Sequence, residues 1–139
     1  MTTSWGFCES DALGYSPGSL AAENVIFEQA AAQGETVFNA SGDGGNDACA
    51  YQSWSPTSPV ETENDPASQP YVVGVGGTTP GALLQPSQER VWNDGNTGGG
   101  GGGGISRLWS QPVWMPATAD ALSTGSRCQA PAGQVCRCV

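Results

Sequence analysis

The order of apolar and polar positions predicts a strand, a helix and a second strand early in the chain. Residues 2–5 are expected to end a strand, and residues 7–16 to form a loop. Ser16-Pro17 is a helix-start signal, because serine can cap a first turn and proline fits the first helical position. The helix is expected over residues 18–33, where one broad face carries Ala22, Val25, Ile26 and Ala30. A short strand over residues 35–40 then completes a right-handed parallel crossover.

The remainder of the chain is less regular. Residues 46–68 are polar and interrupted by prolines, and are therefore predicted to form a long surface loop. The valines of residues 70–78 predict a buried strand, and residues 79–92 are expected to form a hairpin. Residues 98–104 are all glycine. Strands alternating with a helix in this way predict an α/β fold.

Composition excludes several classes of protein. Of the 139 residues, 37% are hydrophobic and 21 are glycine, which is typical of one loop-rich globular domain. The formal net charge of -9 argues against nucleic acid or an anionic membrane as a partner. An acidic surface is common on secreted proteins and also suits acid conditions, and composition leaves both explanations open. Because the sequence has no histidine, it cannot by itself build a Ser-His-Asp or Cys-His site.

The five cysteines indicate an oxidising compartment. Cys128 and Cys136 enclose a short loop that suits a local disulfide, and Cys8 and Cys49 could join the ends of the strand-helix-strand unit. Cys138 is then left over. A zinc site is the alternative, although the spacing of Cys136 and Cys138 is tighter than zinc ligands usually show. No export signal is visible, so for a secreted protein we expect that signal to lie outside this sequence.

Three features are candidates for a chemical site. The glycine run lacks the Gly-Lys-Ser/Thr ending of a phosphate-binding loop, and we interpret it as a flexible segment. Glu61 and Asp65 have the spacing of one helix face, but prolines flank them closely, so we interpret them as solvated loop residues. Asp43 follows Ser41-Gly42 at the end of a predicted strand, where ligands bind in open α/β sheets. The alternative for Asp43 is a turn aspartate that serves only its own backbone.

Several blocks of the sequence, taken in order, resemble the sedolisins, which are serine-carboxyl peptidases with a subtilisin-like fold. The blocks cover nearly the whole chain: Ser4-Trp5-Gly6, residues 32–43, residues 65–78, residues 89–93, the glycine-rich segment ending at Ser106, and residues 109–114. The resemblance implies a three-layer parallel sheet with flanking helices, incomplete in this chain.

The resemblance also divides the chain, as part of a peptidase catalytic domain. Residues 1–45 would form a strand-helix-strand unit with an oxyanion loop, residues 46–69 a surface loop, and residues 70–139 a strand, a hairpin and the glycine-rich segment. The implied function is acid-active proteolysis by a secreted enzyme. Its partners would be protein or peptide substrates and the missing N- and C-terminal parts of the domain.

Roles for particular residues follow from the same resemblance. Asp43 matches the aspartate that the family places in its oxyanion hole. Two further segments match strand edges that pair with the substrate backbone: Ser4, Trp5 and Gly6 on one side, and Ala40, Ser41 and Gly42 on the other. The family uses glutamate, not histidine, as the base for its serine. Asp43 could stabilise an oxyanion only as the neutral acid, because a carboxylate has no proton to donate.

The chain also departs from the family pattern. The family's Glu and Asp, one helical turn apart, lie well upstream of the oxyanion aspartate, and its serine lies downstream in a Gly-Thr-Ser motif that this sequence lacks. The family's calcium site is expected beyond Val139, and no cofactor or metal is expected in this chain. Gly44 follows Asp43 where serine is common. We therefore expect a fragment that is inactive and marginally stable alone. A non-catalytic peptide-binding or decoy module and a small secreted disulfide protein are the alternatives.

Overall fold

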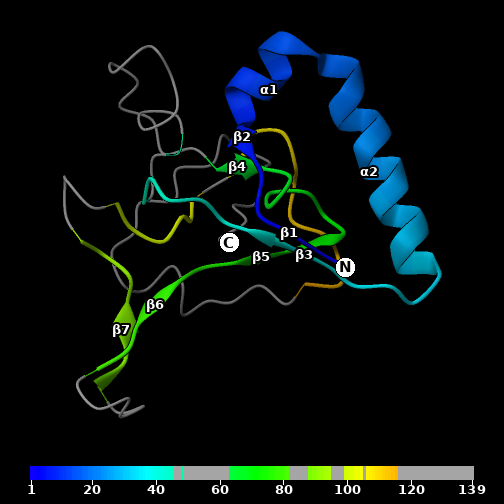
Figure 1. Ribbon diagram of the computed structural model, residues 1–139. Helices are drawn as coiled ribbons and strands as arrows, with labels where there is room; N and C mark the ends of the chain where they lie inside the picture. The colour runs from blue at the N-terminus through cyan, green and yellow to red at the C-terminus, as the bar shows by residue number, and fades with distance from the viewer. Residues whose placement is uncertain (46–47, 49–62, 82–87, 95–98, 105, 116–139) are drawn as a thin grey trace.

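A computed structural model describes residues 1–45, 48, 63–81, 88–94, 99–104 and 106–115 of the chain (Figure 1). The helices and strands follow one another as β1 (Thr2–Thr3), β2 (Phe7–Cys8), α1 (Glu9–Tyr15), α2 (Pro17–Ala32), β3 (Val37–Ala40), β4 (Asn64–Asp65), β5 (Val72–Val75), β6 (Thr78–Thr79) and β7 (Arg90–Val91). Within these residues, no helix is long and apolar enough to cross a membrane.

Three parallel strands form the central sheet, in the order β1-β3-β5. Strand β3 pairs with β1 through Thr3 and Asn39, and with β5 along its whole length, from Val37 opposite Val72 to Ala40 opposite Val75. A helical connection between adjacent parallel strands is the usual way to return the chain to the same end of the sheet. The predicted parallel crossover is therefore confirmed.

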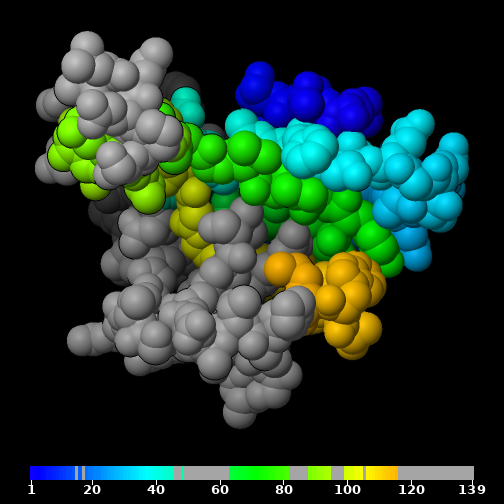
Figure 2. Space-filling model, turned by 90° about the horizontal axis from the view of Figure 1, so that it is seen from below, coloured from blue at the N-terminus to red at the C-terminus, as the bar shows by residue number. Residues whose placement is uncertain are grey.

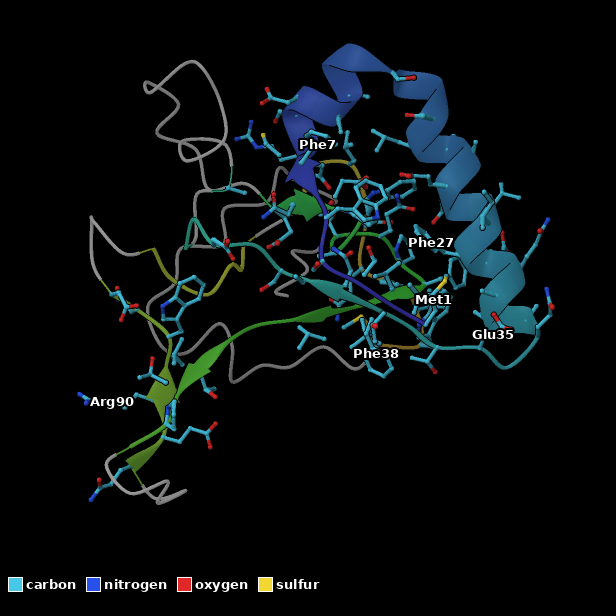
Figure 3. The ribbon with its side chains drawn as sticks, in the orientation of Figure 1. Met1, Phe7, Phe27, Glu35, Phe38 and Arg90 are labelled. Atoms are coloured by element: carbon cyan, nitrogen blue, oxygen red, sulfur yellow. The ribbon has the colours of Figure 1, made fainter. Side chains whose placement is uncertain are left out.

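Helix α2 covers one face of this sheet (Figure 1). Phe27 points from the helix toward the strands and packs with Val37 and Val72, while Ala30 lies against the same cluster (Figure 3). The predicted apolar face is therefore wrong in part, because Val25 and Ile26 are exposed. The buried stripe instead runs through Leu20 and Phe27, two turns apart, and hydrophobicity alone did not distinguish the two faces.

The other face of the sheet carries exposed apolar side chains. Successive residues of a strand point to opposite sides, so Val37 is buried under α2 while Phe38 lies on the far side of the sheet (Figure 3). Val73 and Val75 are 45% and 46% exposed, so only Val72 of the strand's three valines is buried as predicted. The sheet is therefore covered on one side by the described residues.

Two segments expected to be loops are structured. Residues 7–16 contain β2 and the helix α1, whose first turn carries Glu9 and Asp11, where negative charge is favourable to a helix. Residues 63–69 are buried throughout, and their strand β4 pairs antiparallel with β2. The polarity of this segment suggested exposure, but polar groups can be buried when they hydrogen-bond to one another and to the backbone.

The predicted hairpin is confirmed. Strands β6 and β7 pair antiparallel, with Thr78 opposite Val91, and extend away from the central sheet (Figure 1). Trp92 then returns the chain toward the sheet, since its backbone N–H donates to the Gly77 carbonyl at 3.0 Å. In the space-filling view the segment after the glycine run, in orange, lies beside the green part of the chain (Figure 2). The Trp114 and Tyr71 rings lie 5.3 Å apart between centroids, tilted by 30°.

Candidate active site

Asp43 lies just beyond the carboxyl end of β3. The Ser41 N–H donates to the Val75 carbonyl at 3.0 Å, so the pairing of β3 with β5 continues to the residue before Gly42. The Asp43 side chain is exposed and, within the part of the chain that the structure describes, has no hydrogen-bonding or ionic partner. It is therefore a carboxyl group available to a ligand at the edge where open α/β sheets bind ligands.

A second exposed segment leaves the neighbouring strand at the same edge. Residues Ser4 and Trp5 follow β1 and are exposed, and the Trp5 ring meets Phe7 edge to face with 6.4 Å between ring centroids. A Cβ on Gly6 would lie 2.8 Å from the Asp65 carbonyl oxygen, which is too close for any other residue. Glycine at this position lets the segment rest directly on β4.

The segment between β3 and Asp43 is held by a hydrogen bond from Asn64, a residue of β4. The Asn64 Nδ2 group donates to the Ser41 carbonyl at 2.9 Å, and Asn64 is 1% exposed. Gly42 has a φ of 105°, in the left-handed region, and a Cβ there would lie 1.7 Å from Asn64 Nδ2. Only glycine allows the chain to turn here and the amide to reach the Ser41 carbonyl.

The glycine run supports the same segment from another side. The Gly100 N–H donates to the Asp43 carbonyl at 2.9 Å, and the Gly102 N–H donates to the Gly42 carbonyl at 2.8 Å. A Cβ on Gly102 would lie 2.0 Å from the Ser41 carbonyl oxygen. The interpretation of the run as a flexible segment is therefore wrong for these residues, because their lack of side chains permits close backbone packing.

Asp65 is buried, and the interpretation as a solvated loop residue is wrong. Its carboxylate accepts a hydrogen bond from Gln69 Nε2 at 2.9 Å, and the same amide lies 3.4 Å from Glu23 Oε2. The pKa of Asp65 is raised to about 7, mainly by burial; the Gln69 hydrogen bond lowers it, and the nearby negative charges of Glu23 and Glu9 raise it. Glu61, its proposed neighbour, lies outside the described residues.

Glu9 is a buried polar residue for which no sequence pattern indicated a role. Its carboxylate accepts hydrogen bonds from the Ser106 hydroxyl at 2.5 Å and from the Arg107 N–H at 2.7 Å. The Ser106 hydroxyl oxygen in turn accepts from the Trp109 N–H at 2.8 Å. One acidic residue at a helix start carries no sequence signal for such a contact. Glu9 thus joins α1 to the segment after the glycine run.

The structure brings most of the predicted site residues to one edge of the sheet. Ala40 is the last residue of β3, and Ser41, Gly42 and Asp43 follow it; Ser4, Trp5 and Gly6 follow the neighbouring strand β1. Cys8 is buried at the end of β2. Its proposed partner Cys49 lies outside the described residues, as do Cys128 and Cys136. The disulfides Cys8–Cys49 and Cys128–Cys136 therefore stay predictions. Among the described side chains, no three potential ligands gather as a metal site would require.

Three curated proteins are similar to the chain in sequence. Kumamolisin of Bacillus sp. (strain MN-32) is 38% identical over 122 residues, and sedolisin of Pseudomonas sp. (strain 101) is 41% identical over 127 residues. Each of these alignments covers 82% of this chain. Xanthomonalisin of Xanthomonas sp. (strain T-22) is 38% identical over 124 residues, covering 73% of this chain. No family model matches the chain.

A solved structure matches nearly the whole chain. The structure of Pseudomonas sedolisin, a serine-carboxyl proteinase complexed with two molecules of pseudo-iodotyrostatin, covers 99% of this chain with a TM-score of 0.70 and 34% identity. This likeness confirms the predicted fold class, an incomplete subtilisin-like α/β fold. The chain spans 35% of that structure and between 14% and 20% of the length of the three curated relatives.

Proposed function

This chain belongs to the sedolisin family and matches one segment of its members, and we propose a function on that basis. The protein that contains this chain is an acid-active serine-type endopeptidase. The single observation that supports the proposal is the place of Asp43. Its exposed carboxyl follows β3 at the carboxyl edge of the sheet, on a segment held by Asn64 and by the glycine run.

In this function Asp43 donates a hydrogen bond to the oxygen of the scissile carbonyl. Negative charge develops on that oxygen when a nucleophile attacks, and a donor fixed in advance stabilises it. Only the protonated carboxyl has a hydrogen to donate, so the rate should fall as Asp43 loses its proton. The dependence on acid is then a consequence of the donor itself.

The two exposed segments would hold the substrate backbone. A peptide lying along the sheet edge can hydrogen-bond to extended chain on either side of it, as an added strand does. One side is formed by Ser4, Trp5 and Gly6, and the other by Ala40, Ser41 and Gly42. Trp5 is 49% exposed and gives the first side an apolar surface that a substrate side chain can contact.

The nucleophile and its base would come from other parts of the protein. The sequence contains no Gly-Thr-Ser motif and no matching Glu and Asp upstream of Asp43, so these 139 residues alone are expected to be inactive. Calcium is an expectation for the complete domain, and no step here depends on it. A secreted, extracellular location is proposed on the same family basis.

The test is replacement of Asp43 in the longest natural chain that contains these residues. Asp43→Ala should lower kcat on a chromogenic peptide substrate by about 100- to 1000-fold, the usual cost of losing one oxyanion donor. Asp43→Asn keeps a donor at every pH, so its activity should decline less steeply as pH rises. Asp11→Ala, in α1, is the matched control and should change little. An unchanged rate in Asp43→Ala would overturn the proposed function.

A further inference from the structure

The side chain of Asn64 fills the space beside Gly42 at the back of the Asp43 segment. It belongs to β4, which lies 23 positions from Ser41 in sequence, and its Nδ2 group donates to the Ser41 carbonyl. Because Gly42 has no Cβ, there is room for the Asn64 Nδ2 atom, which lies 1.7 Å from the position that a Cβ would take. The hydrogen bond from Asn64 to Ser41 and the turn at Gly42 therefore depend on each other.

The orientation of this amide is determined by its surroundings. With the group turned over, Asn64 Oδ1 would face the Ser41 carbonyl oxygen, and two acceptors would repel each other. The Asn64 backbone N–H donates to Glu63 Oε1 at 3.1 Å, which fixes the base of the side chain. Because Asn64 is 1% exposed, water does not compete for the contact with Ser41.

Hydrogen bonds from the glycine run hold the other side of the same peptides. Gly102 binds the Gly42 carbonyl and Gly100 binds the Asp43 carbonyl, so three successive carbonyl groups, from Ser41 to Asp43, each accept from a different residue. Removing one donor frees one peptide to rotate. The direction of the Asp43 side chain depends on the rotation of those peptides.

We propose that Asn64 is a positioning residue for Asp43: it fixes the Ser41–Gly42 peptide and thereby the direction of the carboxyl, without contacting the substrate. The inference rests on the proposed function, in which Asp43 is the oxyanion donor. A donor displaced by about 1 Å can lower the rate by up to about 100-fold. The expected effect falls on kcat, because the substrate's ground state is held mainly by backbone contacts.

Two variants of Asn64 test the proposal, in the longest natural chain that contains it. Asn64→Leu has a similar size and no donor, and should lower kcat on a chromogenic peptide substrate by about 10- to 100-fold with little change in KM. Asn64→Asp also loses the donor while ionised. At low pH its protonated carboxyl can donate to the Ser41 carbonyl, so its kcat relative to the natural protein should rise as pH falls. A purely structural role would not produce this recovery in fully folded protein.

A pair of glycine variants provides a matched control on the opposite side. Gly102→Ala places a Cβ 2.0 Å from the Ser41 carbonyl oxygen and should lower kcat in the same way as Asn64→Leu. Gly101→Ala changes the adjacent residue equally, but its Cβ would lie 3.4 Å from the nearest atom, an ordinary contact. It should therefore have a much smaller effect. Hydrogen exchange of the Gly100 and Gly102 amides should accelerate in Asn64→Leu while the amides of α2 keep their protection.

The outcomes separate this inference from the function on which it rests. If Asp43→Ala loses activity while folded Asn64→Leu and Asn64→Asp keep the natural kcat, the positioning role is excluded and the function stands. A flat ratio of Asn64→Asp to natural kcat across pH, with both proteins folded, likewise contradicts the role. If Asp43→Ala is fully active, both proposals fail together.

Discussion

Glu9 and Ser106 are 97 positions apart in the sequence, yet the Ser106 hydroxyl donates to the Glu9 carboxylate at 2.5 Å. The carboxylate is 1% exposed, so its two hydrogen bonds, from Ser106 and from the Arg107 N–H, replace the water that it loses on burial. This pair closes a long stretch of chain by polar contacts, in a protein whose described apolar core is small.

Replacing Glu9 should therefore destabilise the fold. In Glu9→Gln one carboxylate oxygen becomes an NH₂ group. If that group faces the Arg107 N–H, two donors meet; if it faces Ser106, the hydroxyl oxygen would have to accept it in addition to the Leu108 and Trp109 N–H groups. The expected loss in the free energy of unfolding is about 1–3 kcal/mol, measured by urea denaturation. Glu35→Gln, an exposed carboxylate just after α2, is the control and should change stability by less than about 0.5 kcal/mol. Equal midpoints for the two variants would contradict the prediction.

Asp65 should make the stability depend on pH. Its pKa is about 7 in the folded protein, mainly through burial, against 3.8 when unperturbed. Between these values the folded state holds a proton that the unfolded state releases, so stability is full below about pH 4 and decreases as pH rises toward 7. The total loss is on the order of a few kcal/mol, from about 1.4 kcal/mol for each unit of pKa difference.

The measurement is a series of urea denaturations from pH 4 to pH 8, comparing the natural protein with Asp65→Asn. The asparagine carries no ionisable proton, so the variant should be more stable at neutral pH and should lose this part of the pH dependence. Its amide still suits both Gln69 and Glu23 as neighbours. Parallel stability curves for the two proteins would show that Asp65 does not hold the proton.

Phe27 should contribute far more to stability than the residue beside it. Phe27 packs between α2 and the valines of β3 and β5, whereas Ile26 is 58% exposed. Phe27→Ala should cost about 3–5 kcal/mol because it leaves a cavity in the core. Ile26→Ala should cost less than about 0.5 kcal/mol. Thermal or urea denaturation of the two variants distinguishes this packing from one in which the helix is rotated.

A disulfide between Cys8 and Cys49 stays a prediction of the sequence. Cys8 is buried on β2, which pairs with β4, and is disulfide-bonded to a residue outside the described part of the chain. Peptide mapping without reduction should recover the peptides of Cys8 and Cys49 joined, and a second linked pair containing Cys128 and Cys136. Recovery of Cys49 joined to a different cysteine would contradict the pairing.

Local patterns predicted the parts of the fold that depend on local chemistry. The crossover from β1 through α2 to β3 follows from periodicity and from Ser16-Pro17, and the β6–β7 hairpin was expected over residues 79–92. The buried face of α2 could not be predicted in this way, because Val25 and Ile26 are as apolar as Leu20 and Phe27. Which face is buried is decided by the sheet, whose contacts join residues far apart in sequence.

In the candidate site, too, local patterns selected some residues and missed those that act through distant contacts. Asp43 could be selected because it ends a strand and matches a family motif, both of which are local observations. Asn64 and Glu9 could not, since each acts through a single contact with a distant segment and neither belongs to a spacing pattern. Residues 63–69 were predicted to be exposed because they are polar. Their burial depends on hydrogen bonds that only the folded chain brings together.

The short strand β4 lies against both segments that leave the sheet beside Asp43. Gly6 rests on the Asp65 carbonyl oxygen, and Ser41 is bound by Asn64, so two adjacent residues determine how far apart these segments stand. A side chain at Gly6 would push the segment after β1 away from β4, and a shorter side chain at position 64 would let the segment after β3 move toward β4. The separation of the two segments thus depends on two neighbouring positions of β4, and natural variation at Asn64 and Asp65 would change it without altering either segment.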